Sequence, residues 1–397
     1  MREKRLYYDD SYLQEFTGQP IQCEQRGEQW FIELNHTAFY PTSGGQPNDL
    51  GTIGNHAVLD VVEEGETIWH VLAADPGDEP CLCRINWDRR YDFMQQHSGQ
   101  HILSQAFLKR LDAMTIGFHL TDTTLTIDLD CEHVSEEDIL WVENEANRVI
   151  WSGRPIHCNW YDNDQLDTLP LRKLPKVEKD IRIVEVADYD WSPCGGTHVA
   201  LTSEIGILKI RRVERSKGVT RVEFLCGGRA LADYRFKNTF ALRMAADLSV
   251  KDRDLPEAWL RQQELAKAAD AELKQMRMEM LEHRASALIT EAKPHPTFAL
   301  VSASFANLDA AELKNLALHL VSHPHIVALL ATESTSGQFV LARSSDVDSI
   351  ALNGILKQLW TEFQGKGGGT PQLVQGALAD ATQREAFLSR AEALLAE

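Results

Sequence analysis

Two short motifs that lie far apart in the chain each carry two potential metal ligands, four residues apart. The first is His97-Ser-Gly-Gln-His101 and the second is Cys194-Gly-Gly-Thr-His198. On a helix, side chains four residues apart share one face, so both imidazoles of the first motif can reach one ion. The two glycines of the second motif allow a tight turn that brings its thiolate and imidazole together. The strongest constraint that this sequence places on the fold is that it must bring the two motifs together.

The joined motifs would supply three nitrogen donors and one sulfur donor, a set that Zn²⁺ favours. Each motif alone has a simpler explanation. Two histidines at this spacing are often ordinary surface or core residues, and a glycine turn beside a buried cysteine needs no metal. No glutamate follows His97, so the HExxH motif of zinc proteases, which carries its own general base, is absent. The zinc prediction therefore rests on the combination of the two motifs.

The pattern of apolar residues predicts an α+β fold with several domains, for which 397 residues provide ample length. Short runs with strand character, separated by Gly, Pro, Asn and Asp turns, fill the first 88 residues. Near Tyr91 the pattern changes to a helix that includes the first motif, and a second helix is expected at 135–150. The later strands of this half are expected at 125–129, 181–186, 205–210 and 219–225.

The region 229–291 is predicted to be helical, with a break near 254–256. Its second half has a seam of residues at alternating spacings of three and four, which is typical of a short coiled coil. The seam residues are Ala266, Ala269, Leu273, Met276 and Met280. The Lys-Pro-His-Pro segment at 293–296 is expected to be a linker. The residues after it alternate strand and helix, which predicts a small α/β domain.

The net charge of −19 argues against a protein that coats nucleic acid with its whole surface. Against this acidic background, two basic clusters are candidate phosphate contacts, although a solvated face is the simpler explanation of each. The first comprises Lys209, Arg211, Arg212, Arg215, Lys217, Arg221 and Arg229, and the second comprises Arg172, Lys173, Lys176, Lys179 and Arg182.

The seven cysteines are odd in number and scattered, which fits a reducing cytosol better than a secreted disulfide framework. The N-terminal stretch lacks the apolar segment of a signal peptide. No apolar run approaches the roughly 20 residues of a membrane helix. We therefore expect a cytoplasmic protein without a membrane partner.

The two motifs also resemble those of a known family, the alanyl-tRNA editing proteins in their long free-standing form. The resemblance includes Thr-Ala-Phe-Tyr-Pro-Thr-Ser-Gly-Gly-Gln at 37–46, which is similar to the glycine-rich segment of that family's N-terminal barrel. Gly-Lys-Gly-Gly-Gly-Thr-Pro at 365–371 resembles the glycine signature in the C-terminal domain of alanyl-tRNA synthetases. The other matching stretches are 94–103, 117–120, 126–129, 193–199 and 202–206.

The resemblance implies four domains. They are an N-terminal glycine-motif β-barrel at 1–88, a zinc-binding editing (deacylase) domain with an antiparallel sheet at 89–228, a helical connector at 229–292 and a tRNA-binding α/β domain at 293–397. One Zn²⁺ per chain is implied, bound by His97, His101, Cys194 and His198. The resemblance also implies RNA contacts at Gly367, Gly368 and Gly369, and a homodimer supported by the helical connector.

The implied activity is hydrolysis of the ester of mischarged Ser-tRNA(Ala), with Gly-tRNA(Ala) left open as a second substrate. The barrel begins at the N-terminus and leaves no room for an aminoacylation domain, so we expect an editing factor that acts in trans. Two alternatives stay open: a non-catalytic tRNA-binding protein with a structural zinc ion, and an editing factor for threonine-specific tRNA. The full ligand set argues mildly against the first, and the two glycine-rich segments favour alanine over threonine.

Serine differs from alanine by one hydroxyl group, so a buried polar group that pairs with this hydroxyl would be left unpaired by alanine. The candidates for this role are Thr115, Gln100, His119 and Thr124, and the candidates for positioning the attacking water are His119 and Gln46. Synthetase editing domains usually carry threonine where Gln100 stands, so the details of discrimination do not transfer at that position. Four protein ligands complete a tetrahedral zinc site, so it stays open whether zinc activates water or only orients the substrate.

Overall fold

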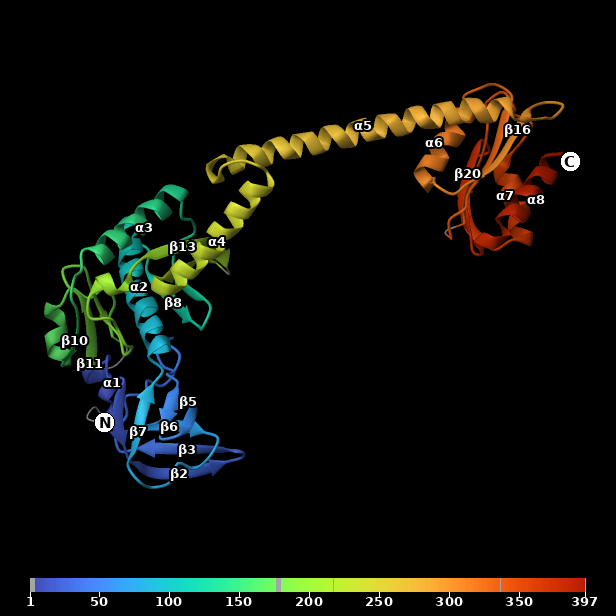
Figure 1. Cartoon of the computed structure of the whole chain (residues 1–397). Helices are drawn as coiled ribbons and strands as arrows, with labels where there is room; N and C mark the ends of the chain where they lie inside the picture. Colours follow the sequence, from blue (N-terminus) through green and yellow to red (C-terminus); the bar gives the residue numbers. More distant parts are fainter. Residues whose placement is uncertain (1–3, 176–179, 217, 336, 397) are drawn as a thin grey trace. The chain divides into compact units, whose positions relative to one another are not determined.

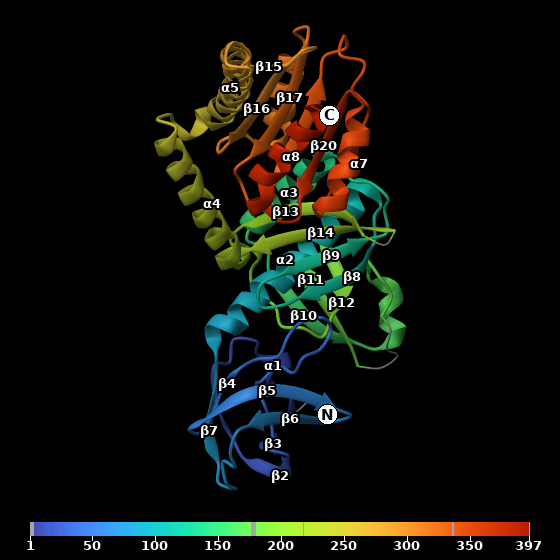
Figure 2. The same ribbon diagram turned by 90° about the vertical axis from the view of Figure 1, so that its right-hand side faces the viewer.

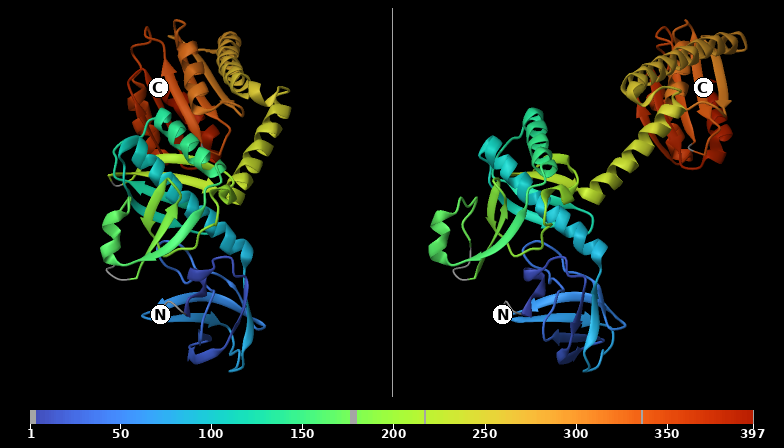
Figure 3. Two further views of the ribbon diagram at one scale, coloured as in Figure 1. Left: turned by 90° about the vertical axis from the view of Figure 1, so that its left-hand side faces the viewer. Right: turned by 60° about the vertical axis from the view of Figure 1, so that its left-hand side comes forward.

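The computed structural model describes residues 4–175, 180–216, 218–335 and 337–396. The chain divides into two compact units, Met1–Met244 and Ala245–Glu397. Figure 1 shows the course of the chain, and Figure 3 shows each unit from two further sides. The two units are described separately.

A seven-stranded antiparallel sheet forms the N-terminal part of the first unit (Figure 1). Its strand order is β1-β7-β4-β5-β6-β3-β2, and the short helix α1 (Leu6–Asp9) precedes it. Buried apolar side chains, among them Phe16, Ile32 and Phe39, form its core. The strands are β1 (Glu15–Gly18), β2 (Pro20–Arg26), β3 (Gln29–Leu34), β4 (Gly51–Ile53), β5 (His56–Glu64), β6 (Thr67–Leu72) and β7 (Cys81–Ile85).

The N-terminal barrel expected from the resemblance is not closed in the described part of the chain. The outer strands β1 and β2 do not pair with each other there. Gln19 alone separates the two strands, which is too short for the two-residue loop of a tight hairpin. Pro20, at the start of β2, also has no N–H to donate to a neighbouring strand. The region is therefore an open sheet.

The rest of the first unit is built around helix α2 (Trp87–Leu111), which contains the first motif. Asn86 caps this helix, because its side chain accepts a hydrogen bond from the Arg89 N–H at 3.2 Å. A four-stranded antiparallel sheet of order β13-β14-β9-β8 shares its core with α2 (Figure 2). The elements around α2 are β8 (Thr115–Leu120), β9 (Leu125–Leu129), α3 (Glu136–Trp151), β13 (Leu208–Ser216) and β14 (Val219–Cys226).

A three-stranded antiparallel sheet carries the second motif at one end. Cys194 follows its last strand directly, and a short 3₁₀ turn, η3 (Thr202–Ile205), comes after His198. This turn explains why the strand expected at 205–210 begins only at Leu208. The strands of this sheet, in the order in which they pair, are β10 (Ile156–Tyr161), β11 (Ile181–Val186) and β12 (Asp190–Pro193), and η2 (Asn163–Thr168) follows β10.

Two long helices follow β14. Helix α4 (Gly227–Asp247) ends before the 3₁₀ turn η4 (Asp252–Asp254), and Pro256 lies in the first turn of α5 (Leu255–Thr290). This arrangement confirms the predicted break, because proline is tolerated at a helix start but not in its interior. Within the described residues, no helix combines the length and the apolar character that a membrane span requires.

The second unit contains a six-stranded sheet of order β15-β16-β17-β18-β20-β19. Strands β16 and β17 are parallel, as their connection through helix α6 requires. Helix α6 packs on one face of the sheet, whereas α7 and α8 pack on the other (Figure 1). The elements are β15 (Lys293–Pro294), β16 (Ala299–Phe305), α6 (Ala310–Val321), β17 (Ile326–Thr332), β18 (Gln338–Arg343), α7 (Leu352–Glu362), β19 (Gly365–Gly369), β20 (Leu373–Leu378), η5 (Ala381–Gln383) and α8 (Arg384–Ala396).

The segment expected to be a linker at 293–296 contributes a strand. Lys293 and Pro294 form β15, which pairs with β16 at the outer edge of the sheet. Proline fits this position, because an edge strand does not need every N–H for pairing. The expectation of a free linker was therefore wrong for these two residues.

Candidate metal centre

The fold brings the two predicted motifs together. Helix α2 supplies His97 and His101, and the loop after β12 supplies Cys194 and His198. One donor atom from each of the four side chains lies within 4.8 Å of the other three. The Cys194 Sγ lies 3.3 Å from His97 Nε2 and 3.4 Å from His198 Nε2. Zinc–sulfur and zinc–nitrogen bonds of ordinary length at a tetrahedral angle would separate such atoms by about 3.5 Å.

The three imidazoles are each held by a partner on the ring nitrogen that faces away from the cluster. His97 Nδ1 lies 2.8 Å from Gln46 Oε1 and His198 Nδ1 lies 3.1 Å from Ser98 Oγ. His101 Nδ1 lies 3.2 Å from the Asp190 Oδ2. Each Nε2 is thereby left for a metal ion, which is the usual arrangement of metal-binding histidines.

Asp190 is the most strongly anchored of these partners. It is buried at the start of β12, and the Arg172 Nε donates a hydrogen bond of 2.7 Å to its Oδ1. Burial alone would raise the pKa of this carboxyl, but Arg172 and His101 lower it to about 2. Asp190 is therefore an ionised group that fixes the ring of His101.

The electrostatics around Cys194 and His198 favour the protonation states that bind a metal, whereas Asp190 and Cys194 raise the pKa of His101 against the effect of burial. Burial alone would raise the pKa of the Cys194 thiol, but His97 and His198 hold it well below its usual range. Burial and the neighbouring His97 lower the pKa of His198 to about 3. A thiolate beside a neutral imidazole is the form in which these residues coordinate a metal ion. The donor set and its supports therefore fit a metal, and the sulfur–nitrogen composition fits zinc.

The glycines of both motifs are required by close packing. A Cβ on Gly196 would lie 2.2 Å from His97 Cε1, so a side chain there would displace a ligand. A Cβ on Gly99 would lie 2.3 Å from the sulfur of Cys226 on β14. Gly99 therefore lets α2 approach the four-stranded sheet closely enough to place both histidines.

Gln46 links the N-terminal sheet to the cluster. It is fully buried, and its Oε1 is shared between His97 Nδ1 and the Thr197 N–H, at 2.8 and 3.2 Å. Its Nε2 donates to Thr197 Oγ1 at 2.8 Å. These contacts favour a role in orienting His97 over the expected role in positioning water.

The segment that carries Gln46 is fastened to α2 by a buried ion pair. Arg90 and Asp49 are both fully buried, and the Arg90 Nε lies 2.9 Å from Asp49 Oδ1. The same guanidinium donates to the carbonyl oxygens of Ala38 at 2.6 Å and Ser11 at 2.9 Å. Breaking a buried pair from one side leaves an uncompensated charge, so this junction keeps the N-terminal segment in place against α2.

Two of the predicted recognition residues meet beside the ligands. The Gln100 Nε2 donates to Ser104 Oγ at 2.7 Å, and the Thr115 Oγ1 donates to the same oxygen at 2.7 Å. Ser104 follows the candidate ligand His101 by three residues on α2, so the two side chains lie on the same side of this helix. Ser104 was not among the recognition residues predicted from the sequence, although it lies one helical turn after Gln100 and His101.

The other two recognition candidates lie apart from this chain. Thr124 is exposed in the turn between β8 and β9, where its hydroxyl pairs with Thr121 at 2.8 Å. The side chain of His119 is 60% exposed, and its Nε2 lies 3.7 Å from Asp128. The preceding residue, Phe118, stacks on His97 with ring centroids 5.1 Å apart. Successive strand residues point to opposite faces, so His119 points away from the metal cluster.

The first basic cluster is largely neutralised by acidic partners on the surface. Exposed pairs such as Arg212–Glu214 contribute little stability, so phosphate groups can replace their carboxylates, whereas the Arg229–Asp92 pair is largely buried. Lys217 lies outside the described residues. The pairs are Lys209–Glu143, Arg211–Glu223, Arg212–Glu214, Arg215–Glu132, Arg221–Asp128 and Arg229–Asp92.

The side chains of the two arginines of the second basic cluster are buried, whereas Lys173 is exposed. Arg172 is buried against Asp190, and Arg182 is only 5% exposed. Both arginines therefore support the metal centre, and their candidacy as surface phosphate contacts was wrong. Lys176 and Lys179 lie outside the described residues.

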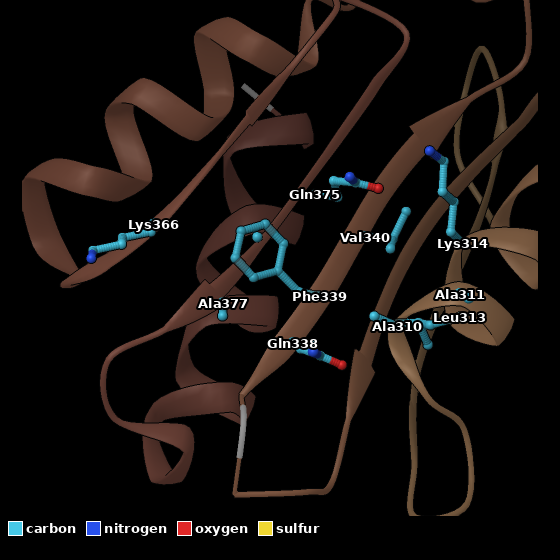
Figure 4. Close-up of a pocket in the computed structure, with 11 residues that line it drawn as sticks. Ala310, Ala311, Leu313, Lys314, Gln338, Phe339, Val340, Lys366, Gln375 and Ala377 are labelled. Atoms are coloured by element: carbon cyan, nitrogen blue, oxygen red, sulfur yellow. The ribbon is translucent and has the colours of Figure 1, made fainter. Parts of the chain in front are cut away.

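In the second unit, the glycine signature forms the exposed edge strand β19. A Cβ on Gly367 would lie 2.5 Å from the Gln375 carbonyl oxygen, so this glycine permits close pairing with β20. A Cβ on Gly368 would meet nothing within 4 Å. Next to this strand is an open cavity of about 520 Å³, whose lining includes Lys314, Gln338 and Gln375. In Figure 4, the side chain of Lys366 extends away from these residues.

Two parts of the chain match known protein families. Residues 181–223, which include the second motif, match the family described as the threonyl and alanyl tRNA synthetase second additional domain. Residues 297–397 match the DHHA1 domain. The first match relates this chain to the threonyl and alanyl tRNA synthetases.

The full-length comparison identifies the particular family. The alanyl-tRNA editing protein AlaX-L of Pyrococcus horikoshii is 31% identical over 399 residues, which cover 97% of this chain and 96% of that protein. The chain belongs to this family of alanyl-tRNA editing proteins, which confirms the resemblance seen in the sequence.

Synthetases and solved structures give more partial matches. The alanine–tRNA ligase of Pyrococcus abyssi is 28% identical over 96% of this chain, but the match spans only 42% of the ligase. The C-Ala domain of Aquifex aeolicus alanyl-tRNA synthetase matches 27% of this chain and 98% of that domain, at 20% identity and a TM-score of 0.25. A TM-score this low supports no conclusion about the fold.

Proposed function

We propose that this chain hydrolyses the ester of mischarged Ser-tRNA(Ala) in trans, with a zinc ion held by His97, His101, Cys194 and His198. Gly-tRNA(Ala) is a second substrate to be tested. The observation that carries the proposal is the joined cluster of four donors in a chain of the alanyl-tRNA editing family. Each histidine in the cluster is also oriented for metal binding by a partner on Nδ1.

When bound, the zinc ion would polarise the ester carbonyl, lower the pKa of a water molecule, or orient the substrate. The protein residues have separate tasks. Gln46, Ser98 and Asp190 hold the three rings in place, and the Phe118 ring covers one side of His97. These supports keep the cluster rigid while the ester is bound.

We assign recognition of the serine hydroxyl to the chain formed by Gln100, Ser104 and Thr115. Gln100 and Ser104 are buried, and both neighbours of Ser104 Oγ lie at 2.7 Å. A serine hydroxyl would form a further hydrogen bond with this polar chain, which an alanine methyl group cannot form. A site built to hydrogen-bond a substrate hydroxyl discriminates by roughly 10⁴ or more.

We assign tRNA binding to two surfaces, one in each unit. The first is the basic stretch 209–229 of the first unit, in which phosphates would replace the acidic partners. The second is the edge strand with Gly367, Gly368 and Gly369, together with the cavity beside it. The long amide and ammonium side chains at this cavity suit the hydrogen-bonding groups of RNA.

We also propose that the helical connector supports a homodimer. Leu273, Met276 and Met280 on α5 are each about half exposed, at 49, 56 and 53%. A second copy of the chain would bury this seam. Replacing Leu273 and Met276 by glutamate should yield a monomer in sedimentation velocity. The same change at Ala268 and Ala271, on the opposite side of the helix, should leave a dimer.

The central experiment compares deacylation of four substrates by purified full-length protein of measured zinc content. Hydrolysis of Ser-tRNA(Ala) that greatly exceeds that of Ala-tRNA(Ala) is expected, and Gly-tRNA(Ala) and Ser-tRNA(Thr) define the range of substrates. Equal rates on the serine and alanine esters would exclude a hydroxyl-dependent site. Zinc without any hydrolysis would favour the binding-protein alternative, and a preference for Ser-tRNA(Thr) would favour the threonine alternative.

A further inference from the structure

A row of side chains crosses the small sheet and ends at the metal cluster. Trp160 on the edge strand β10 pairs in register with Arg182 on β11. On the other side of β11, the Cys194 N–H donates to the Arg182 carbonyl oxygen at 3.1 Å. Residues directly opposite each other on neighbouring strands point to the same face. Trp160, Arg182 and the ligand Cys194 therefore share one face of this sheet.

Arg182 is buried, and one of its N–H donors has no hydrogen-bond partner among the described residues. It is 5% exposed, and its Nη1 donates to the carbonyl oxygens of Cys194 and Gly196, both at 2.8 Å. Within the described part of the chain, the buried Nε is the donor that lacks a partner. A buried cation of this kind favours an electron-rich or anionic ligand.

Tyr8 from helix α1 completes an aromatic cluster with this guanidinium. Its ring centroid lies 5.3 Å from the Arg182 Cζ and 5.3 Å from the Trp160 ring, with an angle of 84° between the rings. Both aromatic rings are half-buried. A Cβ on Gly195 would lie 3.6 Å from the Tyr8 hydroxyl oxygen, so Tyr8 contacts the turn that carries the metal ligands.

We infer that Tyr8, Trp160 and Arg182 form a subsite for the terminal nucleoside of the RNA, on which its base stacks beside the metal centre. This inference rests on the proposed function for the identity of the ligand. Unpaired RNA ends are commonly recognised by stacking on aromatic rings and on arginine planes. The ester is attached to the ribose of this terminal nucleoside, so a base held here keeps the ester next to the cluster.

A binding measurement tests the subsite without any catalytic step. Calorimetry on full-length, zinc-loaded protein compares adenosine 5′-monophosphate with ribose 5-phosphate, which lacks the base. The first ligand should bind more tightly, and Trp160→Ala should weaken its binding roughly tenfold, the effect expected of one lost stacking contact. Trp151→Ala should leave binding unchanged, because Trp151 lies on α3 with 68% exposure, away from this row.

Two further variants, Trp160→Phe and Tyr8→Ala, are compared with Trp160→Ala. The zinc content and circular dichroism of each variant show whether it is folded. Trp160→Phe should retain most of the binding, and Tyr8→Ala should weaken it. Binding of adenosine 5′-monophosphate that is unchanged in folded Trp160→Ala and Tyr8→Ala would overturn the inference. No binding to the wild-type protein at millimolar concentration would overturn it as well.

A kinetic measurement separates the subsite from the proposed function. Seryl esters of adenosine and of a ribose without a base are compared as substrates. Trp160→Ala should raise KM for the adenosine ester with little change in kcat, and should behave like wild type on the ester without a base. If neither ester nor mischarged tRNA is hydrolysed but nucleotide binding depends on Trp160, the proposed hydrolysis fails and the subsite stands. If hydrolysis is independent of the base, the subsite fails and the hydrolysis stands.

Discussion

Gly196 occupies the most confined position in the metal-binding turn. A Cβ there would lie 2.2 Å from Cε1 and 2.4 Å from Nδ1 of His97. Gly196→Ala should therefore displace this ligand and lower zinc affinity roughly 10- to 100-fold, the range seen when the support of a metal ligand is lost. Competition with a chromogenic chelator measures the affinity.

Gly195→Ala is the matched control for this prediction. Its Cβ would have the Tyr8 hydroxyl oxygen as nearest neighbour, at an ordinary contact distance of 3.6 Å. The variant should keep its zinc. Wild-type zinc affinity in Gly196→Ala would show that His97 does not occupy the position described.

His70 makes the stability of the N-terminal sheet dependent on pH. The ring is fully buried between Thr37 Oγ1 at 2.8 Å and the Ile32 carbonyl oxygen at 2.9 Å. Burial lowers its pKa to about 4, from about 6.5 in an unfolded chain. The folded state thus binds fewer protons than the unfolded state in this interval.

The free energy of unfolding should consequently fall as the pH is lowered from about 6.5 to about 4, by roughly 3 kcal/mol in total. Urea titrations of wild type and His70→Gln at several pH values isolate this contribution, because the other histidines are common to both proteins. Parallel pH dependences of the two proteins would contradict the assignment.

At the scale of elements, α2 and β8 together form the polar chain that we assign to hydroxyl recognition. Ser104→Ala removes the oxygen that receives hydrogen bonds from both Gln100 and Thr115. The ratio of kcat/KM for Ser-tRNA(Ala) over Ala-tRNA(Ala) should fall roughly tenfold or more, since each unsatisfied buried group costs about 1–3 kcal/mol. Thr124→Ala, in the exposed turn after β8, should leave the ratio unchanged. An unaltered ratio in Ser104→Ala would show that the serine hydroxyl is recognised by another element.

In the first unit, helices and strands were predictable where the spacing of apolar residues clearly indicates one type of secondary structure. The helix around His97 and His101 and the strands at 125–129 and 181–186 follow from spacing and from turn residues. The ligand set was also predictable, because each half lies within five residues. The contacts that orient the histidines were not predictable, since Gln46 and Asp190 are separated from His97 and His101 by 51 and 89 positions in the sequence. Their partners depend on how three separate sheets and α2 pack.

The pattern of charged residues did not predict which arginines lie on the surface. Arg172 and Arg182 looked like members of a surface cluster, but the structure buries both. A sequence shows that arginines are close along the chain, but it does not show which carboxylates or carbonyl oxygens will face them. The sequence likewise does not show that Phe118 faces the cluster while His119 faces away from it. Which face of β8 is buried depends on the elements that pack against this strand.

For the whole molecule, all four ligands lie within the first compact unit, Met1–Met244. A truncated protein of residues 1–244 should therefore fold, bind zinc and hydrolyse the ester. Loss of the edge strand β19 and its cavity should raise KM for tRNA more than it lowers kcat, the result expected when uniform binding is removed. Steady-state kinetics on full tRNA measures both constants. A folded, zinc-loaded truncation with a much lower kcat at saturating tRNA would place part of the second unit in the active site.

The division of the ligands between α2 and the loop after β12 has a consequence for synthesis. A ribosome releases His97 and His101 long before Cys194 and His198, and folding begins on the part already made. A nascent chain therefore passes through a stage in which two imidazoles are exposed without their thiolate. A chain interrupted before Cys194 carries half of a site and holds metal poorly. The four candidate ligands are complete only after His198 has been synthesised, so we expect metal binding to occur late in the synthesis of the first unit.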